Sequence, residues 1–284
     1  MNDHLTHNDG HSRFFKNTQI PYSRSKEDVW KDMVAQMEER QHSGGRTRSL
    51  VFYRAAAAVV VLLVGLAAFA RFYSATLQAP AGQHVSKTLP GGSKVHLNAG
   101  TELSYHPHWW RFARILELEG EAYFEVEEGN RFTVKSPQGA TRVLGTRFNI
   151  YARNDAYRVF CLSGEVEVES RGGKKKSLAS NQSVSVSKKG KVKYRSDLQP
   201  EHAIAWTKNR FVYTSAPLGE VLKEMERQFD ISIQVDASIG GERYTGNFQR
   251  GSSPKTILEM IVRPFGLEVQ QIHQTKFRIT QSRN

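Results

Sequence analysis

The pattern of apolar and polar positions changes three times along the chain, and the longest apolar run organises the rest. This run extends from Ala55 to Ala70, contains no charged or amide side chain, and lies between Arg54 and Arg71. At 1.5 Å per residue it rises about 24 Å, and its aromatic flanks extend it towards the roughly 30 Å of a bilayer core. The pattern predicts a single transmembrane helix over residues 50–73.

The cations around this helix predict its orientation. Four arginines lie close on its N-terminal side: Arg40, Arg46, Arg48 and Arg54. Beyond the helix there is Arg71 and then Lys87. The positive-inside rule therefore predicts a single-pass protein of the inner (cytoplasmic) membrane, with a cytoplasmic N-terminus and periplasmic C-terminal domains.

Two alternatives to a membrane anchor stay open. A buried helix of a soluble core normally carries a polar stripe, and this run has none over more than four turns. A cleaved signal peptide would fit the A-x-A sequence at residues 68–70. The preceding region is, however, far longer than the usual charged segment of such a peptide.

The segment before the anchor, residues 1–49, predicts one amphipathic helix. Residues 1–22 are polar, lack an apolar period and are expected to be disordered. Ser25 to Asp28 form a capping box, after which Trp30, Met33 and Met37 share one face. A lone helix of about fifteen residues cannot bury such a face, so it requires a partner protein or the membrane surface. A solvated juxtamembrane helix is the alternative. Gln41 to Thr47 is predicted to be a flexible link.

Beyond the anchor, a period of two replaces the helical pattern. Residues 74–83, with Pro80 and Gly82, are predicted to be a spacer. From residue 84 to 198, short alternating runs are separated by turn residues every eight to twelve positions. We expect an all-β domain of about ten or more strands, either a sandwich or a β-helix-like stack.

The last segment, residues 203–284, alternates strand and helix patterns. A strand is expected to start at Trp206, and Leu218 to Phe229 carry apolar residues at helical spacing. Ser253-Pro254 predicts the start of a second helix, which Pro264 and Gly266 end. The order predicts a small α+β domain of the form β-α-β-β-α-β-β.

Composition narrows the choice of partners. The 284 residues carry a formal net charge of +12, and the excess of lysine and arginine lies after the anchor. A basic surface beyond the membrane suits anionic lipid headgroups or an acidic protein, and no direct contact with nucleic acid is expected. Cys161 is the single cysteine, so no internal disulfide is possible, and its apolar neighbours indicate a core position.

No motif argues for a turnover enzyme or a cofactor. The chain contains no G-x-S-x-G, phosphate loop or H-E-x-x-H. His106 and His108, with His84 and His96 nearby in sequence, are candidate ligands of a metal or haem. These histidines lack an identifiable further ligand, and no cysteine or closely spaced acid completes a set. We therefore expect no metal and no cofactor.

Five blocks of sequence resemble the FecR family of anti-sigma regulators, and their order along the chain makes the resemblance specific. The blocks are Leu89–Tyr105, Leu118–Val126, Phe132–Val134, Val143–Ile150 and Gly164–Val168. Two positions depart from the family pattern. Gly91 replaces the aspartate of the usual Asp-Gly-Ser turn, and Arg131 replaces the proline that usually precedes the Phe-x-Val block. Residues 203–284 resemble the secretin and TonB short N-terminal type domain found at the C-terminus of FecR-like proteins.

The resemblance implies a regulator in cell-surface signalling. It implies that an outer-membrane TonB-dependent transducer contacts the C-terminal domain through its periplasmic signalling domain. Proteolysis by an intramembrane or periplasmic protease then frees the cytoplasmic part, which holds or releases an extracytoplasmic-function sigma factor. Trp30, Met33 and Met37 are the predicted sigma-binding residues. The cytoplasmic segment is shorter than in many members of the family.

A membrane-anchored binding module for periplasmic glycan or sugar remains the alternative function. Trp109, Trp110 and Trp206 would serve as its stacking platforms. Such a module would not need a capped helix with a Trp/Met stripe on the cytoplasmic side.

Gly145 and Thr146 form a candidate self-cleavage site. The threonine hydroxyl can attack the preceding carbonyl and convert the amide to an ester that water opens. A glycine leaves that carbonyl uncrowded and tolerates strain, and cleavage within this Leu-Gly-Thr block is a property of some FecR-like proteins. The alternative is structural: Gly145 permits a tight bend, and Thr146 forms a local hydrogen bond.

Overall fold

The computed structural model describes residues 24–43, 46–187, 191–196, 199–235, 239 and 241–282. The chain divides into two compact units, Met1–Ala67 and Ala68–Asn284. The predicted disorder of residues 1–22 lies outside the described residues, as do the two glycines of the predicted link at residues 44–45.

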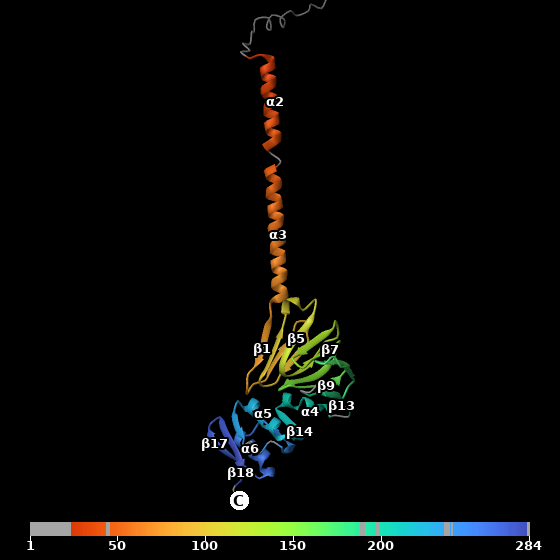
Figure 1. Cartoon of the computed structure of the whole chain (residues 1–284), viewed down its shortest axis with the longest axis vertical. Helices are drawn as coiled ribbons and strands as arrows, with labels where there is room; N and C mark the ends of the chain where they lie inside the picture. Colours follow the sequence, from red (N-terminus) through yellow and green to blue (C-terminus); the bar gives the residue numbers. More distant parts are fainter. Residues whose placement is uncertain are drawn as a thin grey trace, which may run out of the picture. The chain divides into compact units, whose positions relative to one another are not determined.

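Two helices follow one another in the N-terminal part of the chain, α2 (Lys26–Ser43) and α3 (Arg46–Phe72) (Figure 1). The capping box begins α2: the hydroxyl of Ser25 accepts a hydrogen bond from the backbone N–H of Asp28 at 3.2 Å. The predicted link over Gln41 to Thr47 is too long, since α2 continues through Ser43 and α3 begins at Arg46.

The apolar run forms the larger part of α3. Leu50–Phe72, 23 residues, is long and apolar enough to cross a membrane, and none of it is buried within the protein. A helix that is apolar on all sides and unburied is typical of a membrane span rather than of a soluble core. The span Leu50–Phe72 lies within the predicted helix of residues 50–73, and α3 itself begins earlier, at Arg46.

The β domain follows in the second unit. Its strands are β1 (Ala75–Ala79), β2 (Val85–Thr88), β3 (Lys94–Leu97), β4 (Thr101–Tyr105), β5 (Arg114–Glu125), β6 (Phe132–Ser136), β7 (Gly139–Val143), β8 (Arg147–Arg153), β9 (Ala156–Ser163), β10 (Val166–Ser170), β11 (Lys175–Leu178), β12 (Gln182–Val186) and β13 (Val192–Arg195). Within the described residues these 13 strands form one hydrogen-bonded sheet that curls on itself, in the order β11-β10-β7-β6-β5-β8-β9-β12-β13. β3 and β4 also pair with β5, and β2 and β1 lie outside them.

The long strand β5 joins the two halves of this curled sheet. Its first half pairs with β4 and β6, and its second half pairs with β3 and β8. The change of partners occurs at Gly120, which has a φ of 125°. A Cβ at this glycine would lie 2.7 Å from the Cα of Thr101, so only glycine fits the corner. The all-β prediction is confirmed, with a sandwich-like closure.

One segment of the β domain was predicted wrongly. β1 lies inside the predicted spacer of residues 74–83 and pairs antiparallel with β4 over five residues. Its inward positions are occupied by Ala75, Leu77 and Ala79, of which only Leu77 has a large apolar side chain. The alternation of apolar and polar residues is therefore weak. Pro80 and Gly82 therefore mark the turn after a strand rather than a spacer.

The interior of the β domain is apolar and closely packed. Phe124 and Phe148 stack with ring centroids 5.0 Å apart, and Phe132 meets Phe124 edge-on at 6.0 Å. All three are fully buried, and Cys161 is buried beside them in the same core, as its neighbours predicted. Trp110 also packs into this core, against Tyr105 and Phe132.

The rest of the second unit is the α+β domain. Its elements are α4 (Pro200–Ala203), η2 (Ala205–Lys208), β14 (Arg210–Pro217), α5 (Leu218–Phe229), β15 (Ser232–Val235), β16 (Arg243–Gln249), α6 (Pro254–Val262), η4 (Arg263–Phe265), β17 (Leu267–His273) and β18 (Lys276–Gln281). β14 pairs with β16, and β18 lies between β15 and β17. The predicted order β-α-β-β-α-β-β is confirmed. The first strand begins later than predicted, because Trp206 lies in the turn η2, which ends at Asn209 with a left-handed φ of 56°.

Candidate functional site

A buried polar cluster lies where the β domain meets the α+β domain. Asn98 follows β3, Glu121 lies just past the corner of β5, and Asn149 lies on β8. The other side supplies Glu224 and Gln228 from α5. All five side chains are buried, at 9 % exposure or less. Buried polar groups are costly unless they are hydrogen-bonded, so the pairing within this cluster determines how firmly the two domains hold together.

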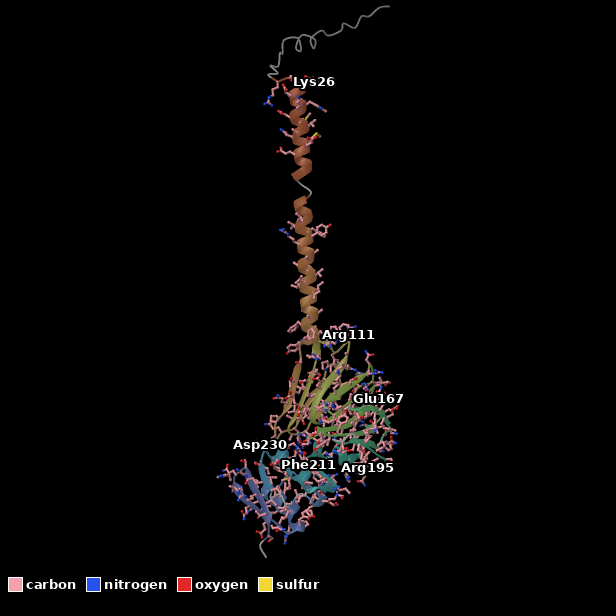
Figure 2. The ribbon with its side chains drawn as sticks, in the orientation of Figure 1. Lys26, Arg111, Glu167, Arg195, Phe211 and Asp230 are labelled. Atoms are coloured by element: carbon pink, nitrogen blue, oxygen red, sulfur yellow. The ribbon has the colours of Figure 1, made fainter. Side chains whose placement is uncertain are left out.

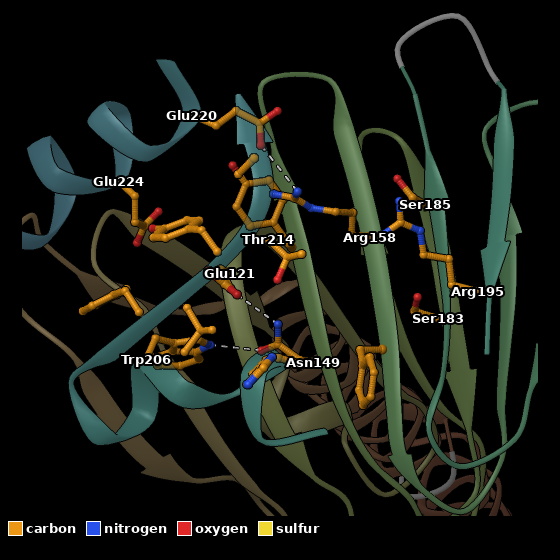
Figure 3. A pocket seen from close by; sticks show the side chains of 18 of the residues that line it. Glu121, Asn149, Arg158, Ser183, Ser185, Arg195, Trp206, Thr214, Glu220 and Glu224 are labelled. Carbon is orange, nitrogen blue, oxygen red and sulfur yellow. Dashed lines mark hydrogen bonds and ion pairs between the residues drawn. The ribbon is translucent and has the colours of Figure 1, made fainter. Parts of the chain in front are cut away.

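Glu121 is held by two asparagine side chains of its own domain. The amide of Asn149 donates to Glu121 Oε1 at 2.9 Å, and the amide of Asn98 donates to Oε2 at 2.8 Å. Trp206, from the turn before β14, donates its indole N–H to Asn149 Oδ1 at 3.4 Å (Figure 3). The carboxyl group of Glu121 is therefore fixed on both oxygens, and the α+β domain reaches it indirectly.

Asn98 and Gln228 make the direct links between the two domains. The Gln228 amide donates to Asn98 Oδ1 at 2.6 Å and to Glu224 Oε1 at 2.7 Å. The Asn98 amide lies 3.4 Å from the same Glu224 oxygen. His84, before β2, completes the set, with its Nε2 at 2.8 Å from Gln228 Oε1. Asn98 and Gln228 each form hydrogen bonds with a side chain of the other domain, so these bonds specify one orientation of the two domains relative to each other.

Two arginines compensate the carboxylates. Arg227, one turn after Glu224 on α5, donates to Glu224 Oε2 from Nη2 at 2.6 Å and from Nε at 3.1 Å. Arg153 on β8 donates to the carbonyls of Ala99 and Gly100 at 2.6 and 2.7 Å and so anchors the loop that carries Asn98. The cluster thus holds two acids and two cations with little contact to water.

The surroundings shift the pKa values of the two acids in opposite directions. Burial, followed by the nearby charge of Glu224, raises the pKa of Glu121 above its usual range. Burial opposes the ionisation of Glu224 as well, but Arg227 and Arg153 outweigh it and lower the pKa of that carboxyl. Burial also lowers the pKa of His84. The cluster therefore makes Glu121 harder to ionise than a free glutamate and makes Glu224 easier to ionise.

A half-open cavity of about 610 Å³ lies next to the cluster (Figure 3). Glu121, Asn149 and Glu224 are among its lining residues, together with basic side chains from both domains: Arg158, Lys193, Arg195, Arg210 and Arg243. Arg158 stacks over the ring of Tyr151 at 4.0 Å and bonds Glu220 of α5 at 3.4 Å. The fixed hydrogen bonds suit a junction that holds two domains together better than they suit bond-making chemistry.

The predicted sigma-binding residues lie elsewhere, on α2 in the first unit. Trp30, Met33 and Met37 are 64 %, 48 % and 66 % exposed. Their spacing of three and four residues places them on one face of the helix, as the sequence predicted. The structure therefore shows an exposed apolar face on α2, and its partner stays a prediction.

Gly145 and Thr146 lie in the turn between β7 and β8, away from the polar cluster. Thr146 is buried, exchanges two backbone hydrogen bonds with Val126, and donates its hydroxyl to the carbonyl of Glu165 at 3.0 Å. A Cβ at Gly145 would lie 2.9 Å from the Cα of Glu128, so the backbone passes too close for a larger residue. This packing is the structural role expected for the pair, and it leaves self-cleavage a prediction.

The tryptophans and histidines weighed from the sequence are dispersed. Trp110 is buried in the β-domain core and Trp206 at the junction with the α+β domain, and Trp109 lies beside Trp110, so the three do not form one stacking platform. His96 pairs with Glu125 at 3.2 Å, while His106 and His108 contact Tyr73. Among the described residues, no group of three His, Cys, Asp or Glu side chains is placed to hold a metal ion.

The polar cluster was not predicted from the sequence. Glu121 occupies the face of β5 that the alternation marks as wet, but the α+β domain covers that face. The available signal was on α5, where Glu224 and Gln228, four residues apart, flank the apolar stripe. Two polar residues at that spacing beside a buried face indicate a polar contact across a domain boundary.

Comparison with known proteins also separates the β domain from the α+β domain. The model of the family described as "FecR protein" matches residues 75–167, and the model described as "FecR, C-terminal" matches residues 210–279. A search of the curated proteins finds no significant match.

Two crystal structures from Parabacteroides distasonis ATCC 8503, each described as a "putative anti-sigma factor", resemble this chain. They are 24 % and 25 % identical to this chain, with TM-scores of 0.69 and 0.68. Each comparison covers 74 % of this chain and 100 % of the other. The shared fold, and the two family models matched in order along the chain, show that this chain belongs to the FecR family of anti-sigma regulators.

Proposed function

We propose that the chain is a single-pass inner-membrane regulator that relays a periplasmic signal to an extracytoplasmic-function sigma factor. In this scheme α3 is the anchor, α2 contacts the sigma factor in the cytoplasm, and the second unit receives the signal in the periplasm. A TonB-dependent outer-membrane transducer supplies the signal, and proteolysis by an intramembrane or periplasmic protease then frees the cytoplasmic segment. The scheme follows from membership of the family together with the order of the parts.

The observation that carries the proposal is the exposed apolar face of α2. A helix that presents Trp30, Met33 and Met37 to solvent cannot bury them alone, and a helix face laid into a groove is a common mode of protein recognition. Aromatic and methionine side chains are also enriched at the centres of protein interfaces. The face is therefore suited to a protein partner.

Co-purification of the full chain with a sigma factor encoded beside it tests this contact. Because hot-spot truncations cost about 2 kcal/mol or more, Trp30→Ala with Met33→Ala should weaken retention about tenfold or more. The double variant Lys31→Ala with Glu39→Ala is the matched control. It changes the opposite face of α2 and leaves the net charge unchanged. Equal retention of the two double variants would exclude this face as the contact.

The proposed contact with the transducer lies at the edges of the three-stranded sheet. β15 and β17 are the outer strands of the three-stranded sheet, and each pairs on one side with β18. An open strand edge accepts an extended segment or an edge strand from a partner. The exposed side chains Val235 on β15 and Ile272 on β17 mark the two edges.

Binding of the transducer's signalling domain to the full chain in detergent separates these edges. Val235→Lys or Ile272→Lys should weaken binding, because a charged edge discourages strand pairing. Met260→Lys, on the exposed face of α6, is the control for an equivalent change of an exposed apolar residue. An effect of Met260→Lys alone would move the contact to the helices.

Self-cleavage between Gly145 and Thr146 is part of the same proposal. The Thr146 hydroxyl oxygen attacks the Gly145 carbonyl carbon, the C–N bond breaks, and the threonine nitrogen leaves as an amine. Water then hydrolyses the ester and restores the hydroxyl beside a new Gly145 carboxylate. The close approach of Gly164 to both Gly145 O and Thr146 Oγ1, where a Cβ would lie 2.9 Å from each, supports a tightly held bond.

Intact-mass analysis of the purified full chain tests the cleavage. Two fragments that join at Gly145 should form in the parent and in Thr146→Ser, which keeps the hydroxyl, and should be absent in Thr146→Ala. A single full-length species in all three after long incubation would leave the glycine and threonine with a structural role.

A further inference from the structure

The loop between β4 and β5, residues 106–113, carries an unusual aromatic sequence that the proposed function does not use. It is called the aromatic loop below and contains the short helix η1 (Pro107–Trp109). Trp110 packs into the β-domain core, whereas Trp109 is only partly buried and Arg111 and Phe112 are exposed. Trp109 and Phe112 lie against each other with ring centroids 4.6 Å apart, and Phe112 is 72 % exposed.

The aromatic loop packs against the last turn of α3, within the second unit. The ring of His108 lies 6.0 Å from the ring of Phe69 and 5.1 Å from that of Tyr73. His106 Nδ1 lies 2.9 Å from the backbone carbonyl of Tyr73. These contacts tie the loop to the end of the apolar helix.

Two arginines, Arg71 and Arg111, lie beside the contact between the aromatic loop and α3. The Arg71 guanidinium lies over the ring of Trp109 at 5.8 Å and over that of Phe72 at 5.6 Å. Arg111 is exposed on the loop, at the end of the β domain that lies away from Phe211 and Asp230 (Figure 2). Aromatic rings interleaved with arginines are typical of the interfacial belt of membrane proteins.

The length of α3 sets the depth of the loop. The 23 residues of the span from Leu50 to Phe72 rise about 34 Å, slightly more than a hydrocarbon core of about 30 Å. Phe72 therefore falls at the boundary with the headgroups, and Phe69 lies about one turn deeper. Side chains that contact Phe69, Phe72 and Tyr73 must lie at headgroup depth whenever α3 spans a bilayer.

We infer that the aromatic loop is a membrane-binding element, in which Trp109 and Phe112 enter the headgroup region while Arg71 and Arg111 contact lipid phosphates. The occupant of this face is the bilayer in which α3 is anchored, because the face is continuous with the end of that helix. An arginine near an anionic surface is attracted to it, and burial of an aromatic ring strengthens the attachment. The loop thus gives the β domain a second attachment to the membrane besides the chain itself.

Spin labelling of the full chain in vesicles tests the inference directly. Single cysteines replace Phe112 in the aromatic loop, Lys174 in the β10–β11 turn, and Val60 in the middle of α3. Each variant is labelled with a nitroxide and reconstituted in vesicles of phosphatidylethanolamine and phosphatidylglycerol. The parent chain, whose single Cys161 is buried, controls for background labelling. Collisions with lipid-soluble oxygen are compared with collisions with a water-soluble nickel chelate.

We expect the labels at residues 112 and 60 to collide more with oxygen and the label at 174 to collide more with the chelate. A chelate-accessible label at 112 beside an oxygen-accessible label at 60 would overturn this inference while leaving the membrane anchor intact. If the label at 60 were also in water, the anchor itself, and with it the proposed function, would fail. A label at 112 shielded from both reagents would assign the face to a second protein and overturn the inference as well.

Discussion

The β domain has two buried faces that are built from opposite kinds of side chain. Phe124 and Glu121 lie on the same strand, β5, three residues apart, and each is at least nine-tenths buried. Phe124 faces a dry core and stacks on Phe148. Glu121 faces α5 through a network of amides and charges.

The difference separates stability from orientation. Apolar packing is nondirectional and tolerates repacking of similar volume, so the core holds the β domain together without fixing anything outside it. Hydrogen bonds are directional, and a buried polar group without its partner is costly. The polar cluster therefore fixes the angle between the two domains, and a small change there should release that angle without unfolding either domain.

The largest effect is expected in the core. Phe148→Ala removes a fully buried ring and leaves a cavity, which should lower the free energy of unfolding by about 3–5 kcal/mol. Thermal unfolding of the full chain in detergent, followed by circular dichroism, measures this loss. Phe112→Ala, at an exposed ring, is the control and should change little. A similarly small loss for Phe148→Ala would show that the core can collapse around the gap.

A smaller effect with a different signature is expected at the cluster. Asn98→Ala removes a side chain that bonds groups of both domains, which should cost about 1–3 kcal/mol. Because the loss falls on the contact between the domains, one unfolding transition should become two. Differential scanning calorimetry of the full chain detects the split, with the exposed Asn247→Ala as control. A single transition at lower temperature would place the effect within the β domain.

Glu121→Gln should change the pH dependence of stability more than its magnitude. The pKa of Glu121 is raised in the folded state, so folding favours the neutral carboxyl. The stability that Glu121 contributes is present below the pKa of about 4.3 in the unfolded chain. It is lost as the pH rises through the higher pKa of the folded chain. Glutamine stays neutral at every pH. The free energy of unfolding of Glu121→Gln, relative to the parent, should therefore rise with pH above about 4.3.

Glu224→Gln is the opposite case and serves as the comparison. The pKa of Glu224 is lowered, so its contribution is present above the unfolded value and is lost as pH falls through the folded value. The variant should therefore lose most, relative to the parent, at neutral pH. Denaturant titrations between pH 4 and pH 8 measure both variants. If the stability of both variants relative to the parent changed with pH in the same direction, the opposite pKa shifts of the two carboxyl groups would be contradicted.

The smallest effect is expected at the rim of the cavity. Arg158 and Glu220 form an ion pair of 3.4 Å between the two domains, and both side chains are 46 % exposed. Exposed pairs contribute about 0–1 kcal/mol, so Glu220→Ala should change stability within that range. The same calorimetry should show one unfolding transition, in contrast to Asn98→Ala. A split transition in Glu220→Ala would move the orienting contact from the buried cluster to the rim.

The fold was largely predictable because its signals are local. The unbroken apolar run predicted α3, the alternation predicted the β domain, and Ser253 with Pro254 marked the start of α6, where the serine side chain accepts from Thr256 N–H. The failures were also local. The short strand β1 has small residues at two of its three inward positions, so it lacks a strong period.

The polar cluster could not be predicted because it depends on contacts between residues far apart in the sequence. Asn98 and Gln228 are separated by 130 residues, and nothing near Asn98 indicates that a helix will cover it. Alternation assigns Glu121 to the solvent face of β5, which is correct for the β domain alone. Only the packing of a second domain turns a wet face into a buried one.

The pairing of β15 with β18 also constrains the order of assembly. These strands run parallel, and β16, α6 and β17 lie between them in the chain. A ribosome or a translocation pore delivers the chain from its N-terminal side, so β15 waits with an open edge until β18 arrives. Loop closure over this distance makes such pairing slow compared with local hairpins. The α+β domain is therefore the last part of the second unit to mature.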